Sequence, residues 1–166
     1  MDRLWSPWRL EYITRTDRDE SCIFCLESRP AENAPLVVFE GRSCYVILNL
    51  YPYNNGHLMV VPRRHVGSLA ALTTDEMSEA GMLTQRCEIA LTEAYRPQGF
   101  NIGVNLGKAA GAGVLDHVHV HIVPRWAGDT NFITVVGDMR VLPESLGESA
   151  ARLRPIFHRL NQETAG

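Results

Sequence analysis

The segment from Asp116 to Pro124 reads Asp-His-Val-His-Val-His-Ile-Val-Pro, so that imidazole and apolar side chains alternate along it. Strict alternation with β-branched residues in the gaps predicts a half-buried β-strand. Side chains at i, i+2 and i+4 of a strand share one face, about 6–7 Å apart. We therefore expect His117, His119 and His121 to point the same way, while Val118, Val120 and Ile122 close the opposite face into a core.

Histidine is concentrated in this segment, which holds three of the six histidines of the chain within five positions. A single histidine here would most simply be a solvated residue. Three in register on one rigid strand instead suit metal ligation, general acid-base chemistry or nucleophilic catalysis. We interpret the segment as the functional centre of the molecule.

The composition describes an ordinary globular protein of one domain, spanning residues 1–166. The hydrophobic fraction is 45%, the charged fraction 21% and the net charge −3, which argues against disorder and against extensive nucleic-acid contact. One small phosphorylated ligand remains compatible with this charge. No apolar run approaches the roughly 20 residues of a membrane span, and the first residues lack the apolar core of a signal peptide. We therefore expect a cytoplasmic protein with no membrane partner.

Hydrophobic patterning predicts an antiparallel sheet of about five strands, in the α+β class. The expected strands are residues 36–39, 44–49, 57–62, 100–105 and the His-rich segment. A capping box at Thr73 to Glu76 predicts the start of a long helix. The apolar stripe of that helix comprises Met77, Ala80, Leu83, Cys87, Ala90, Leu91 and Ala94. We assign Cys87 and both methionines of the helix, Met77 and Met82, to the core. We also expect Cys44 to be a buried strand residue.

The two ends of the chain carry further apolar residues. Leu146, Ala150, Leu153, Phe157 and Leu160 predict a last helix, kinked or broken near Pro155, within a C-terminal extension of residues 137–166. The segment 131–136 reads as a further strand or an extended arm. Residues 1–21 form an N-terminal arm whose tryptophans pack either on the same domain or on a second subunit, and the sequence leaves these two open.

Four cysteines in a reducing compartment are better read for metal chemistry than for disulfides. Cys22-Ile-Phe-Cys25 could be a redox pair, half of a zinc site or a chance spacing. No thioredoxin-like parallel context is visible for a redox pair. Structural zinc is usually four-coordinate, and His65 together with one end of the triple-His strand could supply the two missing ligands.

A loop of small residues, Gly107-Lys-Ala-Ala-Gly-Ala-Gly113, lies directly before the triple-His segment. Backbone N–H groups of such a loop can approach an anionic ligand closely. Glycine turns are common, so the loop becomes informative only through its position beside the histidines.

Three ordered motifs resemble those of the histidine triad (HIT) family of nucleotide hydrolases and transferases. His117-Val-His-Val-His-Ile-Val123 is similar to the signature of that family, Asn55-Gly-His-Leu-Met-Val-Val-Pro-Arg-Arg-His65 is similar to its Gly-His strand, and the Cys-Ile-Phe-Cys opening resembles its zinc-bearing bacterial members. The Trp-Ser-Pro-Trp-Arg opening and the segment from Val123 to Thr134 are similar to members near the diadenosine-tetraphosphate phosphorylases.

The resemblance implies a homodimer of α+β protomers that act on dinucleoside polyphosphates or related nucleoside phosphate conjugates. It places the nucleophile at His119, with His121 and His57 at phosphate oxygens or the leaving group. It places Asn49 at the ribose, Asn105 near the phosphates, and the loop glycines Gly111 and Gly113 and the indole of Trp126 in the substrate site. It assigns Cys22, Cys25, His65 and His117 to a structural zinc, with no metal needed for catalysis.

The loop before the triad departs from the family pattern. Where many members carry Gly-Gln-Ser/Thr or Gly-Ser, this chain has Gly111-Ala-Gly-Val114, so that a side-chain donor to phosphate is missing and backbone N–H groups would replace it. Water and phosphate both stay open as the second substrate. A buried turn tryptophan is an alternative interpretation of Trp126. A phosphoramidase of the same family and a non-catalytic nucleotide-binding protein are alternative functions.

Overall fold

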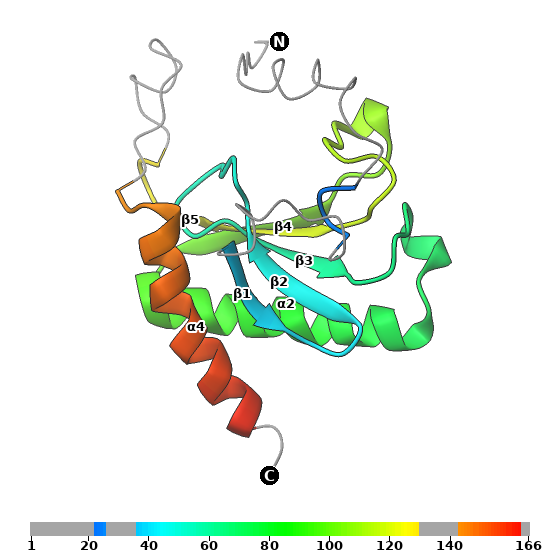
Figure 1. Ribbon diagram of the computed structural model, residues 1–166. Coiled ribbons are helices and arrows are strands. Elements are labelled where there is room, and N and C mark those ends of the chain that lie inside the picture. Colours follow the sequence, from blue (N-terminus) through cyan, green and yellow to red (C-terminus); the bar gives the residue numbers. More distant parts are fainter. Residues whose placement is uncertain (1–21, 26–35, 130–142, 164–166) are drawn as a thin grey trace.

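A five-stranded antiparallel sheet forms the centre of the computed structural model, which describes residues 22–25, 36–129 and 143–163 (Figure 1). The strands are β1 (Val37–Glu40), β2 (Cys44–Leu48), β3 (Leu58–Pro62), β4 (Gly99–Val104) and β5 (Val120–Arg125). They lie in the order β1-β2-β3-β5-β4, and each neighbouring pair is antiparallel. The predicted α+β class and five-stranded sheet are confirmed. The predictions for residues 1–21, the loop to Pro35 and residues 131–136 fall outside the described residues.

Helix α2 (Thr74–Tyr95) runs across one face of the sheet and packs on β2, β3 and β5 (Figure 1). It begins with the predicted capping box: the Thr73 hydroxyl accepts from the Glu76 N–H at 3.2 Å, and the Glu76 carboxylate accepts from the Thr73 N–H at 2.8 Å. It ends at Arg96, whose left-handed backbone (φ 49°) precedes Pro97. Both ends follow from local sequence, since the cap satisfies free N–H groups and proline cannot continue the helix.

Most of the predicted apolar stripe of α2 is buried, but its two methionines are not. Ala80, Leu83, Cys87, Ala90 and Leu91 are buried, whereas Met77 is 45% and Met82 52% exposed. The prediction that both methionines belong to the core is therefore wrong. Met82 lies between the positions of the stripe, and Met77 follows the buried Glu76 by one position, which turns it about 100° away from the buried side of the helix.

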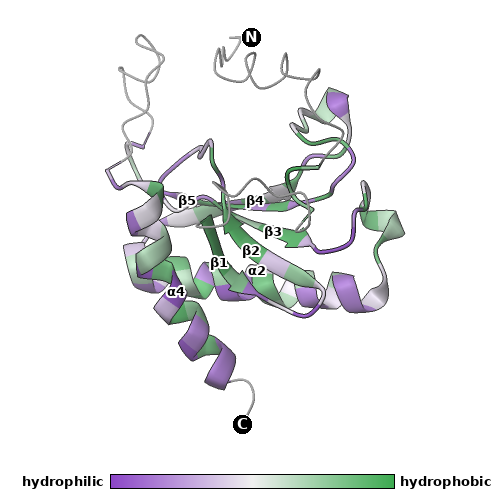
Figure 2. Cartoon of the chain, in the orientation of Figure 1, coloured by the Kyte–Doolittle hydropathy of each residue, from purple (hydrophilic) through white to green (hydrophobic). Residues whose placement is uncertain are grey.

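Helix α4 (Leu146–Glu163) packs against α2 and β1 and continues through Pro155, so it is not broken there, and a kink at Pro155 stays a prediction. Of the five residues that the spacing predicted for its apolar face, Ala150, Leu153, Phe157 and Leu160 are buried and Leu146 is half-buried. Burial of this face offsets the one backbone hydrogen bond that proline removes. Figure 2 shows apolar colours on the strands and polar colours toward the end of α4. None of the described helices is long and apolar enough to cross a membrane.

Strand β5 is shorter than predicted, because it begins at Val120 and not at His117. Its ladder with β3 ends at Val60 paired with Val120, and its ladder with β4 ends at Val104 paired with Val120. One step earlier, the Val118 N–H donates to the Val66 carbonyl at 2.7 Å instead of joining the sheet. His117 and His119 therefore precede the strand, and His119 does not lie in its middle.

Candidate active site and metal centre

The three histidines of the motif divide between two clusters. His117 joins Cys22, Cys25 and His65 in one cluster. His119 and His121 lie with ring centroids 4.8 Å apart, and His121 also contacts His57 at 5.1 Å. All four imidazoles at positions 57, 117, 119 and 121 are buried, with exposed fractions between 0% and 9%. The structure thus brings together the predicted residues as two neighbouring groups.

Three donor-to-donor distances in the first cluster match the dimensions of a tetrahedral zinc site. One ligand atom from each of Cys22, Cys25, His65 and His117 lies within 4.8 Å of the others. Sγ to Nδ1 distances are 3.3 Å for Cys22 to His117, 3.3 Å for Cys25 to His65 and 3.7 Å for Cys25 to His117. A tetrahedron with zinc–sulfur bonds of about 2.3 Å and zinc–nitrogen bonds of about 2.0 Å has edges of about 3.3–3.8 Å. The donor set therefore fits Zn²⁺.

A backbone carbonyl orients His117 toward this cluster. Its Nε2–H donates to the Pro62 carbonyl oxygen at 2.8 Å, which leaves Nδ1 facing the thiols. Burial, followed by the neighbouring His65, lowers the pKa of His117, so the ring is neutral, as ligation requires. Such carbonyl contacts typically fix the tautomer of a metal-bound histidine. When bound, the metal would join the Cys22–Cys25 loop to the sheet and stabilise it.

Phe24 links the two clusters, and sequence reasoning missed it. The ring of Phe24 lies 5.7 Å from His117 and 4.9 Å from His119, centroid to centroid, and only 5% of the residue is exposed. Its carbonyl oxygen accepts from the buried Tyr45 hydroxyl at 2.6 Å. The available signal was an aromatic residue between two cysteines, which on its own does not reveal what the ring touches.

His119 uses the opposite ring nitrogen from His117. Its Nδ1–H donates to the His117 carbonyl oxygen at 2.9 Å. Since a neutral imidazole carries one proton, Nε2 of His119 then holds a lone pair. Burial lowers the pKa of His119, which keeps the ring neutral at neutral pH. This arrangement suits a nucleophile acting through Nε2.

The proton positions of His57 and His121 follow from a peptide N–H. The Tyr53 N–H donates to Nδ1 of His57 at 3.0 Å, and a peptide N–H can only donate. Neutral His57 must therefore carry its proton on Nε2, which lies 3.0 Å from Nδ1 of His121. With His121 accepting at Nδ1, its own proton is on Nε2. His121 can thus present a hydrogen-bond donor beside the lone pair of His119.

Of the predicted substrate residues, Asn49 contacts one of these histidines, whereas for the others the structure gives their place in the fold and their exposure. Asn49 follows β2, and its amide lies 3.4 Å from Nδ1 of His57, while its side-chain oxygen accepts from the Tyr51 N–H. Asn105 follows β4 and is half-buried. Gly111 adopts a left-handed backbone (φ 81°) after a short 3-10 turn (Lys108–Ala110), and Gly113 is exposed. Trp126 is half-buried in the turn after β5, where both its alternative roles stay open.

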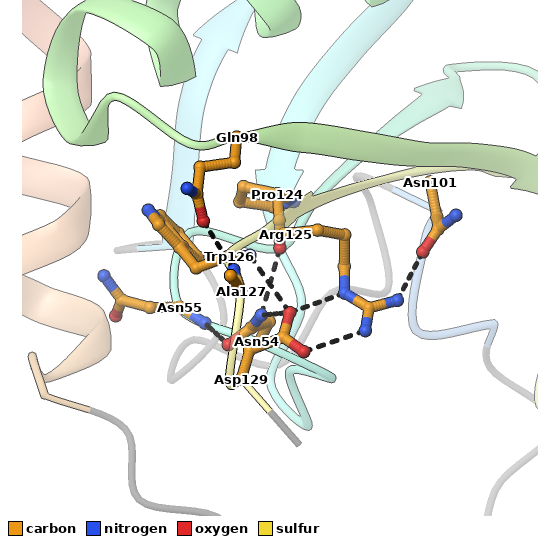
Figure 3. Close-up of polar contacts among 9 residues, drawn as sticks. All are labelled: Asn54, Asn55, Gln98, Asn101, Pro124, Arg125, Trp126, Ala127 and Asp129. Carbon is orange, nitrogen blue, oxygen red and sulfur yellow. Dashed lines mark hydrogen bonds and ion pairs between the residues drawn. The ribbon is translucent and has the colours of Figure 1, made fainter. Parts of the chain in front are cut away.

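Two further features at the site were not found from the sequence. The Tyr53 ring lies 4.7 Å from His57 and 5.8 Å from His121, centroid to centroid. Asp129 binds Arg125 at 2.6 Å and Asn54 at 2.9 Å, far apart in the chain (Figure 3). The Pro, Asn and Gly residues at positions 51–56 are typical of a turn, but a turn pattern does not say which groups face a histidine.

Comparison with protein families assigns the chain to a known family. A family model described as the HIT domain matches residues 30–128. The chain belongs to the HIT family. The AP-4-A phosphorylase of Mycobacterium tuberculosis is 42% identical over 157 residues, which is 90% of this chain and 80% of that protein. The bis(5′-adenosyl)-triphosphatase of Dictyostelium discoideum is 30% identical over 135 residues, covering 77% of this HIT protein and 89% of the relative.

Solved HIT structures agree with the fold, and one of them is described as zinc-bound. A zinc-bound histidine triad family protein from Mycobacterium smegmatis is 30% identical, with a TM-score of 0.68 over 86% of this chain and 97% of that one. A histidine triad nucleotide-binding protein from Sulfolobus tokodaii is 27% identical, with a TM-score of 0.69 over 86% of this chain and 95% of that one. The resemblance drawn from the motifs is confirmed at the level of the family.

Proposed function

We propose that this HIT protein cleaves a nucleoside 5′-phosphate from a dinucleoside polyphosphate, such as diadenosine tetraphosphate, through a covalent nucleotidyl-histidine at His119. The observation that carries the proposal is the hydrogen bond from Nδ1 of His119 to the His117 carbonyl, which leaves the lone pair on Nε2. The named substrates of the phosphorylase and triphosphatase relatives support this substrate class.

The reaction takes place in two displacements at one phosphorus. Nε2 of His119 forms a bond to the α-phosphorus while the bond to the bridging oxygen breaks, and the departing phosphate oxygen keeps the electron pair. His121 donates a hydrogen bond from Nε2 to that oxygen and offsets its developing charge. Water or phosphate then attacks the same phosphorus, loses its proton to solvent, and returns the lone pair to His119.

The remaining predicted residues bind substrate or metal in this proposal. His57 holds His121, Asn49 contacts the ribose, and Asn105 with the backbone at Gly111 and Gly113 contacts phosphate. Trp126 stacks on a base. The four-residue Cys/His cluster holds a structural zinc, and the side chains that act on the substrate require no metal ion.

Trapping of labelled nucleotide tests the covalent step. Wild-type protein mixed with α-³²P-labelled diadenosine tetraphosphate and quenched rapidly should retain acid-labile, base-stable label, as expected of a phosphorus–nitrogen bond. The His119→Ala variant should bind the same nucleotide and retain none. Tight binding by the wild type without label or turnover would support the non-catalytic alternative and contradict the proposal.

A substrate panel resolves the acceptor and the competing enzyme class. Dinucleotides of two to five phosphates should be assayed with and without inorganic phosphate, alongside a nucleoside phosphoramidate. For dinucleotides of four or five phosphates, whose leaving groups are a nucleoside tri- or tetraphosphate, formation of nucleoside diphosphate only with phosphate present indicates phosphorolysis, and formation of nucleoside monophosphate indicates hydrolysis. Faster turnover of the phosphoramidate would favour the phosphoramidase alternative.

We also propose that the protein is a cytoplasmic homodimer. Support for a second copy comes from β4, which lies at an edge of the sheet and exposes 47% of Ile102, since edge strands tend to pair or be covered. Analytical ultracentrifugation should give twice the mass of one chain. A single-chain mass at micromolar concentration would contradict the dimer.

A further inference from the structure

The turn after β5 is organised by one carboxylate, that of Asp129. Its oxygens accept from Arg125 Nε at 2.6 Å and Arg125 Nη2 at 2.9 Å, and from the Trp126 N–H at 3.2 Å. The Asn54 side-chain amide donates to the same carboxylate at 2.9 Å. Only 10% of the Asp129 side chain is exposed. A shielded carboxylate with several donors is held more rigidly than an exposed ion pair.

Asn54 connects this turn to His57, because its side chain binds the turn and its backbone binds His57. Its side-chain Nδ2 donates to the Asp129 carboxylate and, at 3.1 Å, to the Pro124 carbonyl oxygen (Figure 3). Its backbone carbonyl accepts from the His57 N–H at 3.2 Å. The preceding residue, Tyr53, supplies the N–H that fixes the proton of His57. Asn54 therefore joins the end of β5 to the backbone that sets the tautomer of His57.

The far side of the turn is attached to β4. Arg125 Nη1 donates to Asn101 Oδ1 at 2.6 Å, and the Ala127 N–H donates to Gln98 Oε1 at 2.5 Å. Figure 3 shows Asn101 and Asn54 reaching the Arg125–Asp129 pair from different sides. Asn101 thus contacts the same ion pair without contacting the loop of His57, which makes it a matched control.

We propose that Asn54 and Asp129 are positioning residues that hold the Tyr53–His57 loop in register with β5, and thereby keep the proton of His57 on Nε2 and that of His121 directed at the leaving group. This inference rests on the proposed function for its catalytic consequence, but the placement of the proton can be measured without substrate. Small displacements matter here, since a shift of about 1 Å in a catalytic contact can cost on the order of 100-fold in rate.

The test compares Asn54→Asp with Asn101→Ala. The first variant keeps the side-chain oxygen that accepts from the Asn55 N–H, but replaces the Nδ2 donor with a carboxylate facing Asp129. Asn54→Ala removes the donor without adding charge, and serves if the first variant folds poorly. Each variant is assayed on the phenyl and the 4-nitrophenyl esters of adenosine 5′-phosphate, because the poorer phenolate leaving group depends more on the His121 donor.

Asn54→Asp should lower kcat by about 10- to 100-fold on the phenyl ester and by clearly less on the 4-nitrophenyl ester, with KM changed little. Asn101→Ala should lower neither by more than about twofold. In ¹⁵N spectra of the free protein, the ring nitrogens of His57 should show Nε2 protonated in wild type and Asn101→Ala, but a tautomer mixture in Asn54→Asp.

Equal losses on both esters, or unchanged His57 nitrogen signals in Asn54→Asp, would overturn the inference. A wild type that forms no nucleotidyl-enzyme contradicts the proposed function alone, because the nitrogen signals still test the role of Asn54. A wild type that labels normally while Asn54→Asp behaves like Asn101→Ala overturns this inference and leaves the proposed function intact.

Discussion

His117 and His119 lie two residues apart in one motif, and each donates to a backbone carbonyl, but through opposite ring nitrogens. His117 donates from Nε2 to Pro62 and turns Nδ1 to the thiols. His119 donates from Nδ1 to His117 and keeps the lone pair on Nε2. In the proposed function, the same residue type thus serves as a metal ligand or as a nucleophile according to which nitrogen the backbone occupies.

The contrast also separates what each cluster contributes. The cluster around His117 joins the Cys22–Cys25 loop to the segment after β3, so its loss should act first on stability. The cluster around His119 contains the nitrogen proposed to react, so its loss should act first on turnover. Phe24 contacts both rings. If loss of the metal cluster also lowered turnover, Phe24 is the residue through which the two clusters would be coupled.

The largest expected effect comes from exchanging each histidine for asparagine. Asparagine retains an N–H donor but no ring lone pair, so His119→Asn should lower kcat by about 10⁴-fold or more and abolish nucleotide labelling. His117→Asn should retain labelling while losing bound metal. Turnover, nucleotide labelling and zinc content should be measured on the same preparations of both variants. Labelling of His119→Asn at the wild-type level would contradict the different roles proposed for the two histidines.

Removal of the thiols should affect stability more than chemistry. The double variant Cys22→Ser and Cys25→Ser should lose about one equivalent of zinc and on the order of 3 kcal/mol or more of unfolding free energy, since metal binding contributes to folding. Turnover per folded molecule should fall by less, about tenfold at most. Thermal unfolding, metal analysis and activity corrected for folded fraction provide the measurement.

The matched control for the thiol variant is Cys87→Ala, which removes a fully buried sulfur from the core. It should lower stability by about 1–2 kcal/mol and keep its zinc. Native wild-type protein without metal, or a double variant as stable as wild type, would contradict the assignment of the cluster.

A smaller effect is expected at the helix cap beside the metal cluster. Arg64, the neighbour of His65, donates to Glu76 at 2.7 Å and 2.9 Å. The Arg64 guanidinium, followed by the Thr73 N–H, lowers the pKa of Glu76 from 4.5 to about 2. Glu76→Gln should therefore reduce the unfolding free energy by about 1–2 kcal/mol at neutral pH, without changing zinc content or kcat.

The pH dependence of that loss follows from the direction of the pKa shift. A carboxyl whose pKa is lowered in the folded state stabilises it above the ordinary pKa of 4.5, and this contribution is lost as pH falls toward about 2. The difference in unfolding free energy between wild type and Glu76→Gln should thus shrink between about pH 5 and pH 2. Chemical denaturation across this range checks it, and a difference independent of pH would be inconsistent with an ionised Glu76.

Local signals in the sequence predicted the fold because each element is specified nearby. The capping box at Thr73, the continuous apolar runs of β2 and β3, the alternation that leads into β5 and the spacing along α4 each specify their element within a few residues. Errors arose where the environment decides: the apolar character of Met77 and Met82 suggested the core, but both are exposed, and Pro155 does not break α4, whose apolar face is buried.

The residues of the site were predictable as types, but not the way in which the molecule orients them. The sequence named His57, His119 and His121, yet the proton on each ring depends on carbonyl and N–H groups that every residue carries. The Asn54–Asp129 contact spans 75 positions, and no spacing rule reports such a pair. The shortened β5 has the same origin, since the Val118 N–H binds Val66 outside the sheet.

Because two of the four thiols are buried, alkylation of the other two can report whether the proposed zinc site is occupied. Burial raises the pKa of Cys44 to about 12 and raises that of Cys87 further, so neither forms a reactive thiolate under native conditions. Cys22 and Cys25 are the other two of the four cysteines. Mass spectrometry after brief alkylation should therefore record two added groups on chelated protein and none on zinc-bound protein, with no need to measure catalysis.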